Sequence, residues 1–170
     1  MKQLLVFQGP VSSRSGYGDH ARDLVKSLID IDKYDIKIID LRWGDCPRNG
    51  LSEKDKHLQQ LFVGPQGITK QPDIFMQISV PNEFTPYGKY NIGITAGIET
   101  DAVAAPWLEG MNRMDMVIVP SNHAKNVFLN TKYDKLDERT KQKVGELKCT
   151  KPIEVLFEGL DLEIFNKTSE

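Results

Sequence analysis

The chain has 170 residues, of which 39% are hydrophobic, and a formal net charge of −2. This length and composition indicate one globular domain with a core of its own, and the charge gives no indication of nucleic-acid binding or of an acidic membrane surface as partner. No apolar run approaches the ~20 residues of a membrane span or has the form of a signal peptide, so we expect a cytoplasmic protein.

Apolar runs alternate with amphipathic segments along the chain. Alternation and continuous apolar character predict strands, whereas apolar residues spaced three or four apart predict helices. In chain order, the elements predicted are a strand at 3–8, a helix at 18–31, a strand at 34–41, a helix at 52–62, strands at 72–79 and 90–96, a helix at 106–114, a strand at 115–120, a helix at 121–131 and a strand at 151–159.

Residues 132–150 are strongly polar and separate the last predicted helix from the last strand. A run of this composition is most often a solvated surface rather than a binding arm. We therefore expect a solvated helical segment that contributes little to the core.

This alternation of strands and helices predicts an α/β fold, a doubly wound and mostly parallel sheet with helices on both faces (Rossmann-like). Ligands of such sheets bind outside the carboxyl ends of the strands. The residues directly after each strand are therefore the candidate site, namely 9–18, 42–45, 79–83, 96–101 and 121–122.

A glycine-rich loop, GPVSSRSGYGDH, spans residues 9–20. Gly16, Gly18 and Ala21 fit the pattern G-x-G-x-x-G/A, and Asp40 ends the second strand where a dinucleotide fold has its ribose-binding acid. An NAD(P)-binding enzyme is therefore one alternative. Its fingerprint, however, begins directly at the end of the strand, whereas here several residues intervene. The start of the following helix can bind an anion in either case.

Other candidate side chains also follow predicted strands. His20 lies in the first turn of the helix after the loop, where it either faces a ligand or lies on the surface. Glu99 and Asp101 follow the fourth strand, where they either act on a ligand, by accepting hydrogen bonds from hydroxyls of a polyol or sugar or by taking a proton, or cap the next helix. Trp107 either stacks on a ligand or belongs to the core.

Three stretches in this order resemble the N-terminal half of GT-B glycosyltransferases, most closely the large retaining group (glycosyltransferase group 1, family 4-like) that uses nucleotide sugars. The stretches are GPVSSRSGYGDHARDL, IETDAVAAPWLEGMNRMDMVIVPSNHAKNVF and IEVLFEGLDLEIF. The second carries the family pattern at Glu99, Asp101, Pro106, Trp107, Asn112, Asp115, Val117, Val119, Pro120 and Ser121. The third carries it at Gly159, Leu160, Asp161 and Phe165, with leucine in place of the usual valine.

The resemblance implies transfer of a sugar, with retention, from a nucleotide-diphosphate sugar to a glycan or other hydroxyl acceptor. It implies catalytic roles for His20, Glu99 and Asp101. The residues implied to approach the donor diphosphate are Gly16, Tyr17 and Gly18, and those implied to bind the acceptor are Asn82, Glu83, Thr100, Trp107, Ser121 and Asn122. No cofactor beyond the nucleotide sugar is implied, and the sequence has no metal-ligand cluster.

On this interpretation residues 1–165 form a Rossmann-like acceptor-side domain and residues 166–170 a tail at the expected hinge. The family's C-terminal donor-binding domain is absent from the chain, so we expect the chain to be inactive alone. The glycine loop would then be an unliganded, mobile flap facing the interdomain cleft. A non-catalytic ligand-binding module remains a further alternative.

Cys46 and Cys149 lie far apart without metal-ligand spacing, and we expect two free thiols in a reducing compartment. The tripeptide at Asn166 fits the glycosylation sequon. Because no secretion signal is present, we expect it to carry no glycan.

Overall fold

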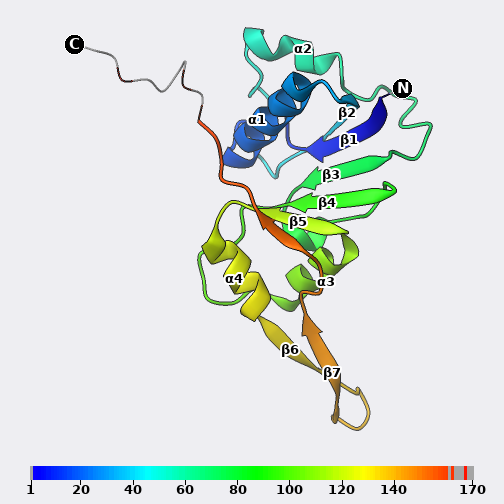
Figure 1. Ribbon diagram of the computed structural model, residues 1–170, viewed down its shortest axis with the longest axis vertical. Coiled ribbons are helices and arrows are strands. Elements are labelled where there is room, and N and C mark those ends of the chain that lie inside the picture. Colours follow the sequence, from blue (N-terminus) through cyan, green and yellow to red (C-terminus); the bar gives the residue numbers. More distant parts are fainter. Residues whose placement is uncertain (1, 161, 163–166, 168–170) are drawn as a thin grey trace.

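The computed structural model describes residues 2–160, 162 and 167. Its main sheet has six strands in the order β2-β1-β3-β4-β5-β8, and every neighbouring pair is parallel (Figure 1). The strands are β1 (Gln3–Gly9), β2 (Tyr34–Asp40), β3 (Ile74–Ile78), β4 (Tyr90–Ile94), β5 (Met116–Val119) and β8 (Ile153–Val155). The helical elements are α1 (Gly16–Ile31), η1 (Glu53–Asp55), α2 (Lys56–Gln59), η2 (Pro81–Glu83), α3 (Ala105–Arg113) and α4 (Asn122–Asn130).

Two clusters of apolar side chains pack against the sheet. The first cluster joins α1 to β1, β2 and β3 and consists mainly of Leu5, Phe7, Val11, Ala21, Val25, Ile36, Ile38, Met76, Ile78 and Ile94. The second joins η2, α3 and α4 to β5 and β8 and includes Phe84, Leu108, Met111, Val117, Val119, Phe128 and Ile153. The predicted doubly wound parallel α/β sheet is therefore confirmed.

Successive side chains of a strand point to opposite faces of the sheet. Neighbouring residues of one strand therefore belong to opposite clusters. In β4, Ile94 belongs to the first cluster, whereas Gly93 faces Phe84 of the second. A Cβ atom on Gly93 would lie 2.5 Å from the Phe84 ring, so glycine makes room for this core residue.

The order of the strands reverses between β1 and β3. From β1 the chain passes through α1 to β2 on one side, and it then continues with β3, β4, β5 and β8 on the other side. Such a switch point leaves a crevice outside the carboxyl ends of the strands, where ligands of this fold class bind.

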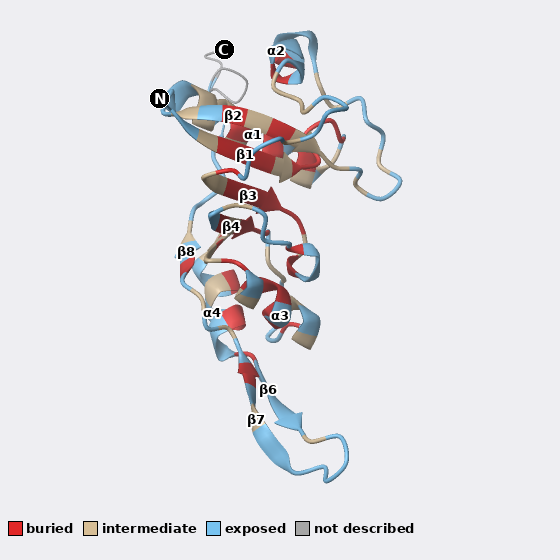
Figure 2. Ribbon diagram, turned by 90° about the vertical axis from the view of Figure 1, so that its right-hand side faces the viewer, coloured by how far each residue is buried: buried red, intermediate tan, exposed pale blue. Residues whose placement is uncertain are grey.

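Residues 132–150 do not form the expected helix but a hairpin, β6 (Lys132–Leu136) and β7 (Lys143–Lys148), which projects from the body of the domain (Figure 2). Tyr133 pairs with Leu147, whose side chain is buried, and the Tyr133 hydroxyl donates to the Val103 carbonyl over 2.6 Å. Charged residues lie directly before and after Tyr133 and Leu147 in their strands, which is the alternation typical of a strand. The prediction was wrong because it weighed overall polarity above this alternation.

Two other predicted elements are shorter than expected. The helix predicted at 52–62 consists of η1 and the single turn of α2, and the last strand covers only Ile153–Val155. The motif residues Asp161 and Phe165 and the sequon residue Asn166 lie outside the described residues, as does most of the predicted tail at 166–170.

Cys46 and Cys149 are both half-buried and unpaired, as predicted. No helix in the described part of the chain is long and apolar enough to cross a membrane.

Candidate functional site

A hollow of about 260 Å³ lies at the carboxyl edge of the sheet. Segments that follow four different strands form its walls, as expected for a ligand site in this class of fold. The lining residues are Gly16, Tyr17 and His20 after β1, Trp43 after β2, Ala96 after β4 and Glu158 after β8. We call this the edge hollow.

Tyr17 fixes one wall of the edge hollow. Its ring stacks on Trp43 with 4.3 Å between ring centroids. Its hydroxyl oxygen accepts a hydrogen bond from the Ala96 amide over 3.2 Å and lies 3.3 Å from the Thr95 hydroxyl. One side chain of α1 thereby holds the segments after β2 and β4 in place.

His20 and Glu158 form the opposite side of the edge hollow, with 3.3 Å between Nδ1 and Oε1. The chain after β8 runs past the start of α1 (Figure 1), and Glu158 of this segment contacts His20 of α1. Burial lowers the pKa of His20 below its ordinary 6.5, although Glu158 and Asp23 act to raise it. The imidazole is therefore mostly neutral at pH 7 and able to accept or donate a hydrogen bond.

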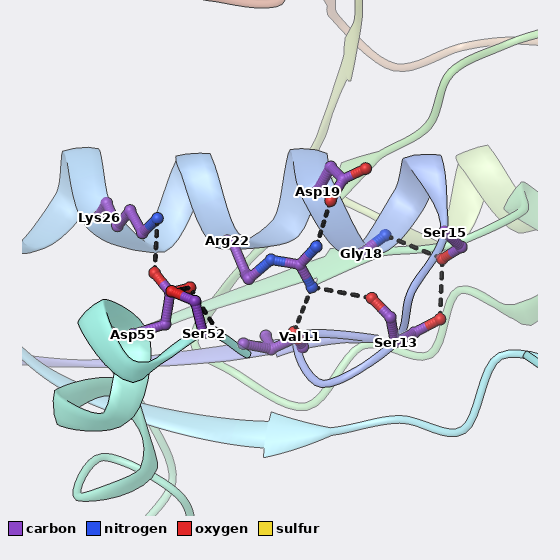
Figure 3. Close-up of polar contacts among 9 residues, drawn as sticks. All are labelled: Val11, Ser13, Ser15, Gly18, Asp19, Arg22, Lys26, Ser52 and Asp55. Carbon is purple, nitrogen blue, oxygen red and sulfur yellow. Dashed lines mark hydrogen bonds and ion pairs between the residues drawn. The ribbon is translucent and has the colours of Figure 1, made fainter. Parts of the chain in front are cut away.

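The glycine loop is anchored by Arg22, which is 6% exposed. Its guanidinium Nη1 donates to the carbonyls of Val11 and Ser13, each over 2.8 Å, and Nη2 pairs with Asp19 (Figure 3). These hydrogen bonds from a buried charged group tie the loop to α1.

The tip of this loop is not the flap that the sequence suggested. Residues 16–18 form the first turn of α1, and the Ser15 side chain caps the helix by accepting from the Gly18 amide over 3.1 Å. The spacing of apolar residues predicted a helix from Gly18, and α1 begins two residues earlier because the Ser15 cap offsets the low helix propensity of the glycines.

The two glycines of this turn, Gly16 and Gly18, differ in their surroundings. A Cβ atom on Gly18 would lie 2.2 Å from the Ser13 carbonyl oxygen, so Gly18 lets the loop pack on the helix. A Cβ atom on Gly16 would meet nothing within 4 Å. The packing of the chain therefore does not require glycine at position 16, which borders the edge hollow.

Asp40, the candidate ribose-binding acid, holds the loops in place. Its Oδ1 accepts from the Ser12 amide over 2.8 Å, and its Oδ2 pairs with Arg48 at 2.5 Å. The side chain is only 5% exposed. Both oxygens therefore have protein partners, which argues against the dinucleotide alternative.

Glu99, Thr100 and Asp101 are exposed in the loop between β4 and α3 and do not line the edge hollow. The Thr100 hydroxyl donates to the Ala102 carbonyl over 2.8 Å. Within residues 2–160, neither carboxylate forms a hydrogen bond or an ion pair. The structure thus separates the two acids from His20.

The acceptor residues after β3 lie in η2. The Glu83 carboxylate accepts a hydrogen bond from the Ser79 hydroxyl, and the Asn82 carbonyl accepts one from Arg113 over 2.8 Å. Glu83 lines a second pocket, of about 500 Å³, rather than the edge hollow.

The remaining predicted acceptor residues belong to the region of α3 and α4. Trp107 stacks on Phe128 at 6.2 Å between ring centroids and packs against the second apolar cluster. Ser121 caps α4 by accepting from the Ala124 amide over 3.1 Å, and Asn122 is exposed at the first position of that helix. These side chains do not form one cluster with Glu83.

Glu158 was missed as a candidate because the last strand was predicted to extend to Gly159. A shorter strand would have placed Glu158 among the residues that follow a strand end. In the part of the chain that the structure describes, no group of three or more His, Cys, Asp or Glu side chains is placed to hold a metal ion.

Neither a comparison with protein-family models nor one with curated protein sequences finds a match to this chain. The fold and the site by themselves define a Rossmann-like α/β domain with a hollow at the carboxyl edge of its sheet.

Proposed function

We propose that the chain is the acceptor-side half of a retaining GT-B glycosyltransferase, which transfers a sugar from a nucleotide-diphosphate sugar to a hydroxyl acceptor. The ordered motifs of the sequence and the parallel α/β sheet support this proposal. The observation that carries it is the edge hollow, where the start of α1 and the half-buried His20 meet at the carboxyl edge.

The start of α1 gives the edge hollow groups that suit a leaving diphosphate, although Glu158 in the lining carries a negative charge. The start of α1 presents backbone N–H groups and the positive end of the helix dipole, which stabilise the charge that develops when the diphosphate departs. Gly16 leaves space there for the phosphate oxygens. His20, one turn further along, donates a hydrogen bond to the donor or the acceptor.

No carboxylate nucleophile is required when departure and attack take place on one face of the sugar. Glu99 and Asp101 need not be near the reacting atoms in this mechanism, and they lie outside the edge hollow. A second, donor-binding domain would hold most of the nucleotide, so we expect this chain alone to bind the donor weakly and not to turn it over.

The donor site is tested by NMR titration of the ¹⁵N-labelled chain with UDP-, GDP- and ADP-glucose at millimolar concentrations. We expect at least one of them to shift the amides of residues 16–20. Gly16→Val should abolish these shifts without unfolding the chain, because the space beyond Gly16 is open. Gly145→Val is the matched control, since a Cβ on this hairpin glycine also meets nothing within 4 Å.

Transfer itself is assayed with the chain joined to the donor-binding half that the proposal requires. Gly16→Val should abolish transfer, whereas Gly145→Val should leave it unchanged. Full transfer by the Gly16→Val variant would contradict the proposal. Micromolar binding of NAD or NADP to the chain would favour the dinucleotide alternative instead.

A further inference from the structure

A second pocket, of about 500 Å³, lies on the face of the sheet opposite α1. The neighbouring strand residues Phe7, Ile38 and Ile78 all belong to the α1 cluster, so the alternate residues face away from it. Three strands, the residue after β2, and η2 with the segment after it contribute the lining residues, which are Gln8, Ile39, Leu41, Phe75, Gln77, Glu83, Thr85 and Tyr87. We call this the sheet-face pocket.

Two glutamines lie side by side in the middle of the sheet. Gln8 is in register with Gln77 on one side and with Ile39 on the other. Central strands of parallel sheets are apolar on both faces, so amide side chains at this position are unusual and informative.

Gln77 has a structural role. It is 4% exposed, and its Nε2 donates to the Glu83 carbonyl over 3.0 Å while its Oε1 accepts from the Thr85 amide over 2.9 Å. Both ends of this amide are therefore occupied in holding the segment that forms one wall of the pocket.

Gln8 differs from its neighbour. Its side chain is half-buried and lines the pocket, and no residue among 2–160 forms a hydrogen bond with its amide. The Gln8 amide therefore offers the pocket an acceptor oxygen and two N–H donors.

Tyr87 presents an aromatic surface on a fixed backbone. The Asn91 Oδ1 accepts from the amides of Tyr87 and Gly88, each over 2.8 Å. The Tyr87 ring packs edge-on against Phe75 at 5.8 Å between centroids and is still 47% exposed. Its orientation is therefore set before any ligand arrives.

The charge of the pocket restricts its ligand. Glu83 is the only charged side chain in the lining, and one of its oxygens already accepts from Ser79. The neighbouring cation Arg48 is paired with Asp40. Phosphates and carboxylates are therefore disfavoured, whereas uncharged hydroxyl groups find partners in Gln8 and Glu83.

From these features we infer that the sheet-face pocket binds an uncharged sugar ring. The apolar face of the ring packs on Tyr87, and its hydroxyls form hydrogen bonds with the Gln8 amide and the Glu83 carboxylate. Ile39 and Leu41 cover the rest of its apolar surface.

The position of the pocket fits the acceptor. Leu41 lines the sheet-face pocket, and Trp43, the next residue but one, lines the edge hollow. A sugar in this pocket therefore lies beside the edge at which the donor would bind. That the pocket binds a sugar does not depend on the proposed glycosyltransferase function. That the bound sugar is the acceptor rests on that function.

The probes are the methyl glycosides of glucose, galactose and mannose, with glucose 6-phosphate as the anionic counterpart. Binding to the chain is measured by saturation-transfer NMR and by ¹⁵N shifts of the residues that line the pocket. We expect at least one neutral glycoside to bind in the millimolar range, and glucose 6-phosphate to bind more weakly because Glu83 repels it.

Gln8→Leu should weaken binding of that glycoside about 3- to 10-fold, the effect of one or two lost hydrogen bonds. Tyr87→Ala should weaken it similarly, and Tyr87→Phe, which keeps the ring, should preserve it. Gln142→Leu, an exposed glutamine at the hairpin, is the matched control. Because Tyr87 is half-exposed, its alanine variant tests the pocket even if Gln8→Leu does not fold.

The inference is overturned if none of the three glycosides binds, if both Gln8→Leu and Tyr87→Ala bind like the wild type, or if glucose 6-phosphate binds more tightly than the neutral sugars. The two proposals fail separately. If glycoside binding depends on Gln8 but no nucleotide sugar shifts residues 16–20, the pocket remains a sugar site and only its role as acceptor site falls.

Discussion

The loop between β1 and α1 and the loop between β4 and α3 both begin at the carboxyl edge of the same sheet, and the sequence marks both as candidate sites. The first is held by a buried arginine and a serine cap, and it leads into a hollow. The second carries Glu99 and Asp101 on its exposed surface, outside that hollow.

A position directly after a strand therefore does not by itself make a binding site. A preorganised site needs side chains that are held in one orientation by neighbours. Tyr17 and His20 have such neighbours in Trp43 and Glu158. The predictions below test how much of this order each contact provides.

Gly18→Val should have the largest effect. The new side chain would collide with the Ser13 carbonyl, which belongs to the backbone and has no room to move. We expect a loss of about 3–4 kcal/mol of unfolding free energy in urea. Gly16→Val, in the same turn but facing open space, should lose less than about 1 kcal/mol of unfolding free energy. Equal losses in the two variants would show that the two glycines do not differ in this way.

Arg22→Leu should come next, with a loss of about 2–3 kcal/mol, because the carbonyls of Val11 and Ser13 and the carboxylate of Asp19 would lose their donor. Urea unfolding measures the loss, and Arg14→Leu, at an exposed position of the same loop, is the control. If both variants are equally stable, the loop does not depend on its buried arginine.

Asp55 attaches η1 to α1 through Lys26, at 2.7 Å, and also accepts hydrogen bonds from Ser52, the N-cap residue of η1 (Figure 3). Burial opposes ionisation of Asp55, but the hydrogen bonds from Lys26 and Ser52 outweigh burial and lower its pKa to about 2. The carboxylate therefore stabilises the fold above its unfolded pKa of 3.8, and this contribution is lost as the pH falls from about 4 through 2.

Asp55→Asn should therefore remove about 1–2 kcal/mol at pH 7 and little at pH 2. Urea unfolding at several pH values measures this. Asp45→Asn is the control, because Asp45 is fully exposed. A loss that is the same at pH 7 and pH 2 would show that the charge of Asp55 does not matter.

The His20 pKa tests the edge hollow. Because burial lowers it, the unfolded chain takes up a proton before the folded one, so stability should fall as the pH drops below 6.5. NMR titration should give a His20 pKa below 6.5, and Glu158→Gln should lower it further by removing a favourable charge. Glu154→Gln, on β8, should leave it unchanged. An unchanged His20 pKa in Glu158→Gln would remove Glu158 from the hollow.

The smallest effect is expected from Glu99→Gln combined with Asp101→Asn. Both side chains are exposed, so the unfolding free energy should change by less than about 0.5 kcal/mol. Binding of nucleotide sugars and of neutral glycosides to the chain is measured alongside. A strong loss of binding to either ligand would show that the loop between β4 and α3 belongs to the site, as the glycine loop does.

The sequence by itself indicated the order of most strands and helices along the chain, and from it the fold class. Apolar runs at 3–8, 34–41 and 72–79 carry the strand signal so strongly that chain order and fold class followed from them. It also pointed to Gly16, Tyr17 and His20, because residues after a strand in a parallel sheet gather at one edge.

Only the tertiary structure decided which of these residues meet. Glu158 reaches His20, and Trp43 stacks on Tyr17, through the order in which the strands pair, and local sequence patterns do not encode that order. The sheet-face pocket has the same origin, since Gln8 and Gln77 look like ordinary strand residues until pairing sets them side by side. Periodicity reports which residues share a face, whereas contacts between distant segments depend on packing across the whole domain.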